Sequence, residues 1–228
     1  MTDSSASSSV TPVQDRLPIP WYERPLVTYA LLSAIVGIYI ITYIIDQTGD
    51  PQAVNPIYQY GILDYSLVTQ YGQWYRLLSA MFVHLSPAHI LFNGYALWIF
   101  GKEVERLFGH VHFAIIYFLG GLCGSLASLY LTRADSAGAS GAIFAIFAAE
   151  IVYVAYYRKM LGKVGSAALR QLLILVVINF GLDIAANSVP GGTPIDTWGH
   201  VGGLLGGLIL AYLLIGSARP PRQVPSAA

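Results

Sequence analysis

The fold of this 228-residue chain is decided by one stretch, Ser136-Ala137-Gly138-Ala139-Ser140-Gly141-Ala142-Ile143-Phe144-Ala145-Ile146-Phe147. Its second half opens a long apolar run that reads as a membrane helix. Its first half consists of small residues, which let another helix come close to the backbone at Ser140. The Ser140 hydroxyl therefore has two interpretations. It is a hydrogen-bonding group between packed helices, or a nucleophile that receives a base and an oxyanion site from other helices.

The composition is typical of a membrane protein. The chain is 55% hydrophobic and 11% charged, whereas soluble domains carry roughly 25% charged residues. Its net charge is zero and it has no basic block, so nothing supports a nucleic-acid partner. The one cysteine, Cys123, lies in an apolar run, which argues against a disulfide framework and a cysteine-based metal site.

Six apolar segments follow one another along the chain, at residues 25–45, 86–100, 112–131, 140–157, 172–186 and 200–215. They predict an all-α integral membrane bundle with six spans. Several are shorter than the ~20 residues of a typical span, so either their ends extend into flanking residues or the bilayer is locally thinned. We expect a disordered tail at 1–20, a membrane domain at 21–217 and a short cytoplasmic tail at 218–228.

The distribution of basic residues predicts the orientation. Ten of the twelve Lys and Arg fall on one side of the six spans, and only Arg76 and Arg133 fall on the other. The positive-inside rule then places both termini in the cytoplasm of a cell membrane. The connection at 46–85, between the first two spans, is rich in Tyr and Trp, which favours short helices lying at the outer membrane interface.

The polar residues of the spans gather near one surface of the membrane. The second, fourth and sixth segments run inward, and each has its polar side chains at or just before its start: His84, His89, Asn93, Ser140 and His200. Polar groups inside a membrane are costly and mark functional sites by default. These five residues therefore form the candidate site, in the outer half of the bilayer.

Ser140 and His200 are candidates for a nucleophile and its base. Histidine is the usual base because its pKa lies near neutrality. Gly203 and Gly207 share a helical face with His200 and would let that helix approach Ser140. The alternative is a packing seam of small residues that carries a hydrogen-bonded serine and histidine, and the residues alone leave both readings open.

His89 and Asn93 lie four residues apart, on one helical face. Both can donate hydrogen bonds to an oxyanion, together with the N–H of Ser140. Hydrogen bonding between helices is the alternative role. A metal site made of histidines and Asn93 is disfavoured, because no carboxylate or cysteine completes a zinc set. We expect no metal and no cofactor.

Taken together, four motifs resemble those of the rhomboid intramembrane serine proteases: Trp74-x-Arg76, His84-x4-His89-x3-Asn93, Gly138-x-Ser140-Gly141 and Gly199-His200-x2-Gly203-x3-Gly207. The resemblance runs from about residue 20 to 220. It implies the six-span prokaryotic form and a catalytic dyad, with Ser140 as nucleophile and His200 as base. It assigns the oxyanion to His89, Asn93 and the Ser140 amide.

The resemblance also implies supporting roles. Phe144 would pack under the His200 ring, Arg76 of the Trp74-x-Arg76 motif would hold the outer loop, and His84 would line the site. Two acidic residues fall near the dyad. Asp196, one turn before His200, could orient the imidazole as a third triad member or cap its helix. Asp183 is expected to form a hydrogen bond within the bundle.

The expected activity is cleavage of a peptide bond in or near the outer end of a substrate's transmembrane helix, with single-span proteins of the bilayer as substrates. Water would enter through a polar cavity open to the outer side and lined by His84, His89, Asn93 and His200. Two rivals remain: a catalytically silent binder of helical clients, and a small transporter or channel.

Overall fold

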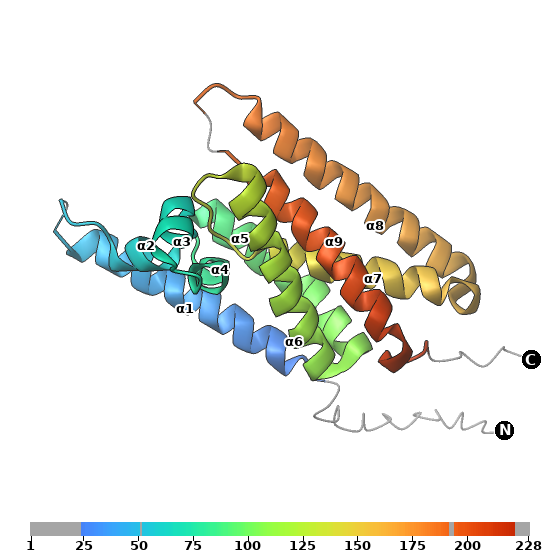
Figure 1. The fold of residues 1–228 in the computed structure, drawn as a ribbon. Helices are drawn as coiled ribbons and strands as arrows, with labels where there is room; N and C mark the ends of the chain where they lie inside the picture. The colour runs from blue at the N-terminus through green and yellow to red at the C-terminus, as the bar shows by residue number, and fades with distance from the viewer. Residues whose placement is uncertain (1–23, 51, 192–193, 222–228) are drawn as a thin grey trace, which may run out of the picture.

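The computed structural model describes residues 24–50, 52–191 and 194–221. The expected tail at 1–20 and residues 222–228 of the expected C-terminal tail lie outside the described residues. The described chain is almost entirely helical (Figure 1). It contains no strand, only an isolated antiparallel bridge between Leu63 and Ser136.

The first helix, α1, spans Leu26–Thr48 and starts directly after Pro25. It carries no charge before Asp46. Its N-terminus is held by the buried Glu105, whose carboxylate accepts hydrogen bonds from the backbone N–H of Val27 at 2.8 Å and of Thr28 at 2.7 Å. A carboxylate at this position satisfies N–H groups that have no partner within the helix.

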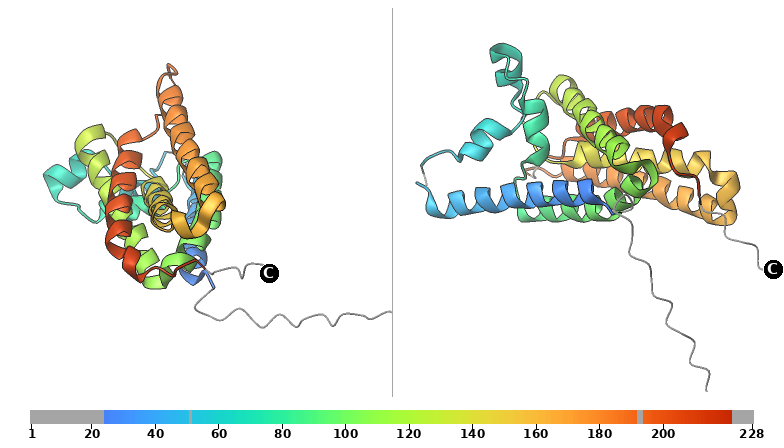
Figure 2. Two further views of the ribbon diagram at one scale, coloured as in Figure 1. Left: turned by 90° about the vertical axis from the view of Figure 1, so that its right-hand side faces the viewer. Right: turned by 90° about the horizontal axis from the view of Figure 1, so that it is seen from below.

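The connection after α1 contains short helices, as the sequence predicted. They are α2 (Pro56–Gly61), α3 (Tyr65–Tyr71) and α4 (Arg76–Ser79), followed by the turn η2 (Ala80–Phe82). Asn55 and Asp64 cap α2 and α3 by accepting from backbone N–H groups. Gly72, with φ of 68°, ends α3 in the left-handed region that glycine tolerates best. In Figures 1 and 2 this segment and α8 lie on opposite sides of the bundle.

The middle of the chain forms one long helical run with a sharp break. It consists of α5 (Pro87–Ala96), η3 (Leu97–Gly101), α6 (Lys102–Ala127) and η4 (Ser128–Thr132). Gly109 interrupts α6 with φ of 78° and ψ of 165°, which no helix contains. The chain turns there, so the run comprises two helices that meet at Gly109.

The last three helices are α7 (Ser140–Tyr156), α8 (Arg158–Asn187) and α9 (Thr197–Leu214), with a final turn η5 (Ile215–Ser217). Gly162 breaks the start of α8 with φ of 59°. α8 thus begins well before the predicted boundary at residue 172, and most of its surface is exposed in the protein.

The core lies where α6, α7 and α9 pack against one another. Glycines allow these helices to approach one another closely. A Cβ at Gly203 or Gly207 would fall well inside van der Waals contact with the backbone of Gly141 or Ala145 on α7. α9 therefore lies backbone to backbone on α7, as small residues allow in membrane helices.

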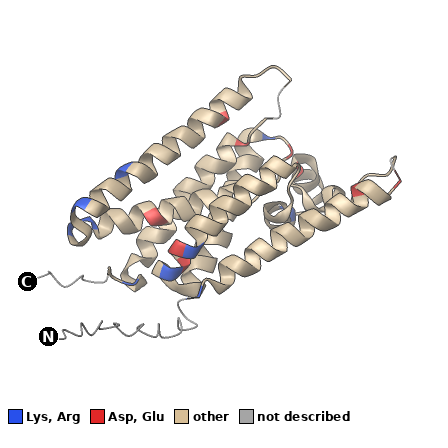
Figure 3. Ribbon diagram, turned by 180° about the vertical axis from the view of Figure 1, so that it is seen from behind, with Lys and Arg blue, Asp and Glu red and all other residues tan. Residues whose placement is uncertain are grey.

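Four helical stretches of the described chain are long and apolar enough to cross a membrane: Leu26–Thr48, Pro87–Thr132, Arg158–Asn187 and Thr197–Ser217. The shorter α7 is also apolar. Among the described residues, most Lys and Arg positions lie toward the end of the bundle where α1 begins and α9 ends (Figure 3).

Candidate functional site

Ser140 is the first residue of α7, at the end of this helix that meets the start of α9. The Cα of Gly141, the next residue, lies close to the backbone of both Gly124 on α6 and Gly199 on α9. As the first residue of a helix, Ser140 has an N–H without a helical partner. Its side chain is partly exposed, and its hydroxyl forms no hydrogen bond within the described chain.

His200 lies in the first turn of α9 and is 7% exposed. Its ring stacks on Phe144, with centroids 4.4 Å apart and an interplanar angle of 20°. Its Nδ1 lies 2.6 Å from Oδ2 of Asp183, which is 4% exposed. The imidazole is thus held on one face by α7 and at one nitrogen by α8.

No hydrogen bond joins Ser140 to His200 among the described residues, so their direct contact stays a prediction. What the fold brings together is the two helix starts. Phe144, which lies one turn after Ser140 on α7, stacks on the His200 ring. The glycines of α9 keep α7 and α9 in backbone contact.

His89 approaches the segment that leads into Ser140. Gly138 has φ of 127°, which favours glycine, and a Cβ there would lie 2.5 Å from Nε2 of His89. The lack of a side chain at Gly138 therefore serves both its backbone conformation and the position of the His89 ring. This links α5 to the residues just before Ser140.

Asn93 is 6% exposed, and its Nδ2 donates to the carbonyl oxygen of His89 at 3.0 Å, within α5. No hydrogen bond reaches from Asn93 to Ser140 in the described chain. The amide has a second N–H to donate. Its predicted role toward an oxyanion stays a prediction.

His84 precedes α5 and is 1% exposed. Its ring packs edge-on against His89, with centroids 5.0 Å apart. Neither ring nitrogen has a hydrogen-bond partner among the residues that the structure describes. Burial, with a smaller contribution from the charge of His89, lowers the pKa of His84 to about 4. His84 is therefore a neutral ring near pH 7.

The cavity beside Ser140 differs from the one we expected. It has a volume of about 20 Å³, which is room for one water molecule. None of His84, His89, Asn93 and His200 lines it. Its lining consists mostly of small residues from α6, α7 and the preceding loop, with Ser125, Ser136, Ser140 and Asp196 as polar members.

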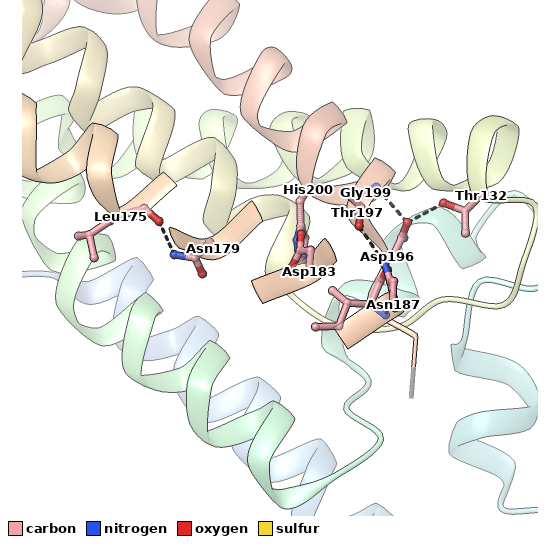
Figure 4. Close-up of polar contacts among 10 residues, drawn as sticks. Thr132, Leu175, Asn179, Asp183, Asn187, Asp196, Thr197, Gly199 and His200 are labelled. Atoms are coloured by element: carbon pink, nitrogen blue, oxygen red, sulfur yellow. Dashed lines mark hydrogen bonds and ion pairs between the residues drawn. The ribbon is translucent and has the colours of Figure 1, made fainter. Parts of the chain in front are cut away.

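Asp196 caps α9 rather than touching the imidazole. Its carboxylate accepts hydrogen bonds from the N–H of Gly199 at 3.0 Å, from Thr132 Oγ1 at 2.7 Å and from Ser136 Oγ at 2.8 Å (Figure 4, which draws the first two). Of the two roles weighed for Asp196, the structure has the helix cap. The carboxylate that does contact His200 is Asp183, for which a hydrogen bond within the bundle was expected without the partner being identified. The signal was available, because Asp183 is a charge inside an apolar segment.

Arg76 anchors the segment between α1 and α5. It is 1% exposed, and its guanidinium donates to Gln73 Oε1 at 2.8 Å and to the carbonyl oxygens of Ile62 and Gln59 at 2.7 Å each. Trp74, by contrast, is half exposed. Within the described residues, no three His, Cys, Asp or Glu side chains lie close enough to hold a metal ion.

Comparison with known proteins places these residues in a family context. Residues 71–217 match the family model of the Rhomboid domain. Rhomboid protease GluP of Bacillus subtilis (strain 168) is 33% identical over 192 residues, which cover 84% of this chain and 35% of GluP. RHOMBOID-like protein 7 of Arabidopsis thaliana is 33% identical over 161 residues, which cover 68% of this chain and 47% of that protein.

A relative of more similar length is the putative rhomboid protease YdcA of Bacillus subtilis (strain 168). It is 25% identical over 156 residues, which cover 68% of this chain and 74% of YdcA. The chain spans less than half the length of GluP and RHOMBOID-like protein 7.

Proposed function

Because this chain belongs to the rhomboid family, we propose that it is an intramembrane serine endopeptidase with Ser140 as nucleophile and His200 as general base. Family membership and the long apolar helices make it an integral membrane protein. The observation that carries the proposal is the fixed imidazole of His200, stacked on the helix that Ser140 begins. A histidine held this way is suited to taking a proton from one nearby hydroxyl.

The proposed reaction proceeds through an acyl-enzyme. Ser140 Oγ attacks the scissile carbonyl carbon and its proton passes to Nε2 of His200, which then protonates the leaving amine. Water, deprotonated by Nε2, releases the acyl group and the proton returns to Oγ. The negative charge on the tetrahedral oxygen is met by the Ser140 N–H at the start of α7, with His89 and Asn93 as further donors.

The proposed topology has six spans with both termini in the cytoplasm of the cell membrane. It is supported by the break at Gly109, which divides Pro87–Thr132 into two helices. The basic end of the bundle is then the cytoplasmic one. Helices α2–α4 would lie at the outer interface, and residues 21–217 would form the membrane domain.

The proposed substrates are single-span membrane proteins. A helix hides its carbonyl groups in internal hydrogen bonds, so the scissile segment must unwind before Ser140 can reach it. This favours substrates with small or helix-breaking residues near the outer end of the span. The single-water cavity beside Ser140 is a small polar space from which hydrolytic water could come.

The test compares the full chain with Ser140→Ala in proteoliposomes that contain a single-span model substrate. Ser166→Ala is the matched control, since the Ser166 hydroxyl hydrogen-bonds only within α8. We expect cleavage and fluorophosphonate labelling to persist in the control and to vanish in Ser140→Ala. Cleavage that survives in Ser140→Ala would exclude the dyad, and binding of helical clients without cleavage by the wild-type protein would favour the silent binder.

A further inference from the structure

Asp183 of α8 contacts the nitrogen of His200 that the proposed mechanism does not use. Its Oδ2 lies 2.6 Å from Nδ1 of His200, and both side chains are buried. Figure 4 shows the two side chains facing each other between α8 and α9. This is the single hydrogen bond that the Asp183 side chain forms in the described chain.

The chemistry of this contact selects the tautomer of His200. An ionised carboxylate can only accept a hydrogen bond, so the hydrogen of a neutral imidazole must lie on Nδ1. The lone pair then lies on Nε2, the atom that must take the proton of Ser140. When Nε2 is protonated, the buried carboxylate also faces the positive charge of the imidazolium.

Asp183 is the one buried charged side chain of α8. The other buried residues of this helix are Gly165 and Leu172, and most of its surface is apolar and exposed. A buried carboxylate costs free energy unless it is paired, so its presence here calls for a function. One turn earlier, Phe180 packs on the Phe144 ring at 5.3 Å between centroids. α8 therefore supports the imidazole at Nδ1 and also supports the ring beneath it.

We propose that Asp183 is the positioning residue for His200, so that Ser140, His200 and Asp183 act as a triad. The proposal rests on the proposed function. The proton balance is unchanged from the dyad: Asp183 stays ionised throughout, and the proton moves from Oγ to Nε2 and then to the amine nitrogen as the C–N bond breaks. Asp196, the other candidate in the sequence, already serves as the cap of α9.

The test uses the full chain in proteoliposomes, with kcat and KM measured separately on a single-span substrate. Asp183→Asn is expected to lower kcat by about 10² to 10⁴-fold, because an amide can hold the wrong tautomer, with KM within about threefold. The kcat of Asp183→Glu is expected to be at least tenfold higher than that of Asp183→Asn. Asn179→Leu is the matched control one turn away on α8, since the Asn179 amide bonds only to Leu175 of its own helix, and it should keep kcat.

Asp183→Leu separates positioning from structure. Removing the carboxylate leaves Nδ1 of the buried imidazole without a partner, so this variant is expected to have a lower thermal unfolding temperature than the wild type. Cleavage is therefore measured well below that temperature, and kcat per folded molecule is expected to fall as in Asp183→Asn. A purely structural role would leave kcat per folded molecule at the wild-type value. Wild-type kcat in Asp183→Asn and Asp183→Leu, or a loss of kcat that merely follows unfolding, would overturn the proposal.

A readout without catalysis distinguishes this proposal from failure of the proposed function. Nitrogen-15 NMR of histidine-labelled protein, with His200 assigned through His200→Gln, reports which ring nitrogen carries hydrogen. In the wild type we expect the hydrogen of the His200 ring to lie on Nδ1. In Asp183→Leu we expect the downfield resonance of this Nδ1 proton to be lost. A wild-type His200 with hydrogen on Nε2 alone would refute the proposal even in an active protein. The expected tautomer in an inactive protein would uphold the positioning contact and reject only the protease function.

Discussion

The aromatic ring of Phe144 lies nearly parallel to the imidazole of His200, with centroids 4.4 Å apart. Phe144 comes one helical turn after Ser140, so a single face of α7 carries the proposed nucleophile and also supports its base. Phe144 is itself 6% exposed and is backed by Phe180 of α8. The position of the base is therefore set by packing from two other helices as well as by α9.

Replacing Phe144 should affect catalysis through the imidazole. Stacked ring pairs contribute about 0.5–1.5 kcal/mol beyond the area they bury, so Phe144→Ala is expected to lower kcat by about tenfold. Phe144→Tyr keeps the ring and should stay within about threefold of the wild type. Both values come from steady-state cleavage of a single-span substrate. Equal kcat for Phe144→Ala and the wild type would show that the stack does not hold the base.

The contact between α7 and α9 should not tolerate a methyl group. A Cβ at Gly203 would overlap the backbone of Gly141, and overpacking of this kind costs about 1–3 kcal/mol. Gly203→Ala is thus expected to lower the thermal unfolding temperature and abolish cleavage. Gly37→Ala on α1 is the control, because nothing lies within 4 Å of a Cβ there. That variant should be neutral or slightly more stable, and similar losses in both variants would contradict the packing argument.

Arg76 is expected to be essential to the segment between α1 and α5. Arg76→Lys cannot satisfy the three oxygens that the guanidinium reaches. Each buried acceptor left without a partner costs about 1–3 kcal/mol. The variant should therefore show faster proteolysis at residues 50–75 and a lower unfolding temperature. Tyr71→Ala, at a side chain that is 71% exposed, should change little, and an unaltered proteolysis pattern in Arg76→Lys would rule out the anchor.

Stability is expected to fall in mild acid because of His84. Burial lowers the pKa of His84 from 6.5 to about 4, so between these values the unfolded chain binds more protons than the folded protein. The stabilisation is complete above pH 6.5 and is lost as the pH falls toward 4, by up to about 3 kcal/mol. Unfolding temperatures across this range should drop less in His84→Phe than in the wild type. Parallel curves for the two proteins would assign the acid sensitivity to other groups.

Much of the fold followed from local patterns. The apolar runs predicted the long helices, because a backbone in lipid must satisfy its hydrogen bonds internally. The connection rich in Tyr and Trp was predicted to hold short helices, and α2–α4 are there. The predicted ends of the helices were less accurate. α8 extends far ahead of residue 172, because its first turns carry charges that a hydropathy pattern counts as loop.

The lining of the cavity beside Ser140 could not be predicted from a single segment, because it is made of residues from several helices that meet there. Spacing along the chain suggested Asp196, and not Asp183, as a possible partner of His200. Asp196 is one turn away in sequence, yet its carboxylate is taken up by the N–H of Gly199 and the hydroxyls of Thr132 and Ser136.

The sequence by itself determined the membrane class, the long apolar helices and the family motifs around Ser140 and His200, because composition, periodicity and residue spacing are local properties of a chain. Only the tertiary structure decided that Asp183 meets His200. That contact joins two residues that are seventeen positions apart in sequence and lie on different helices, and it depends on how α8 is rotated and placed against α7 and α9. Helix rotation is set by packing, and the sequence pattern of one helix does not contain it.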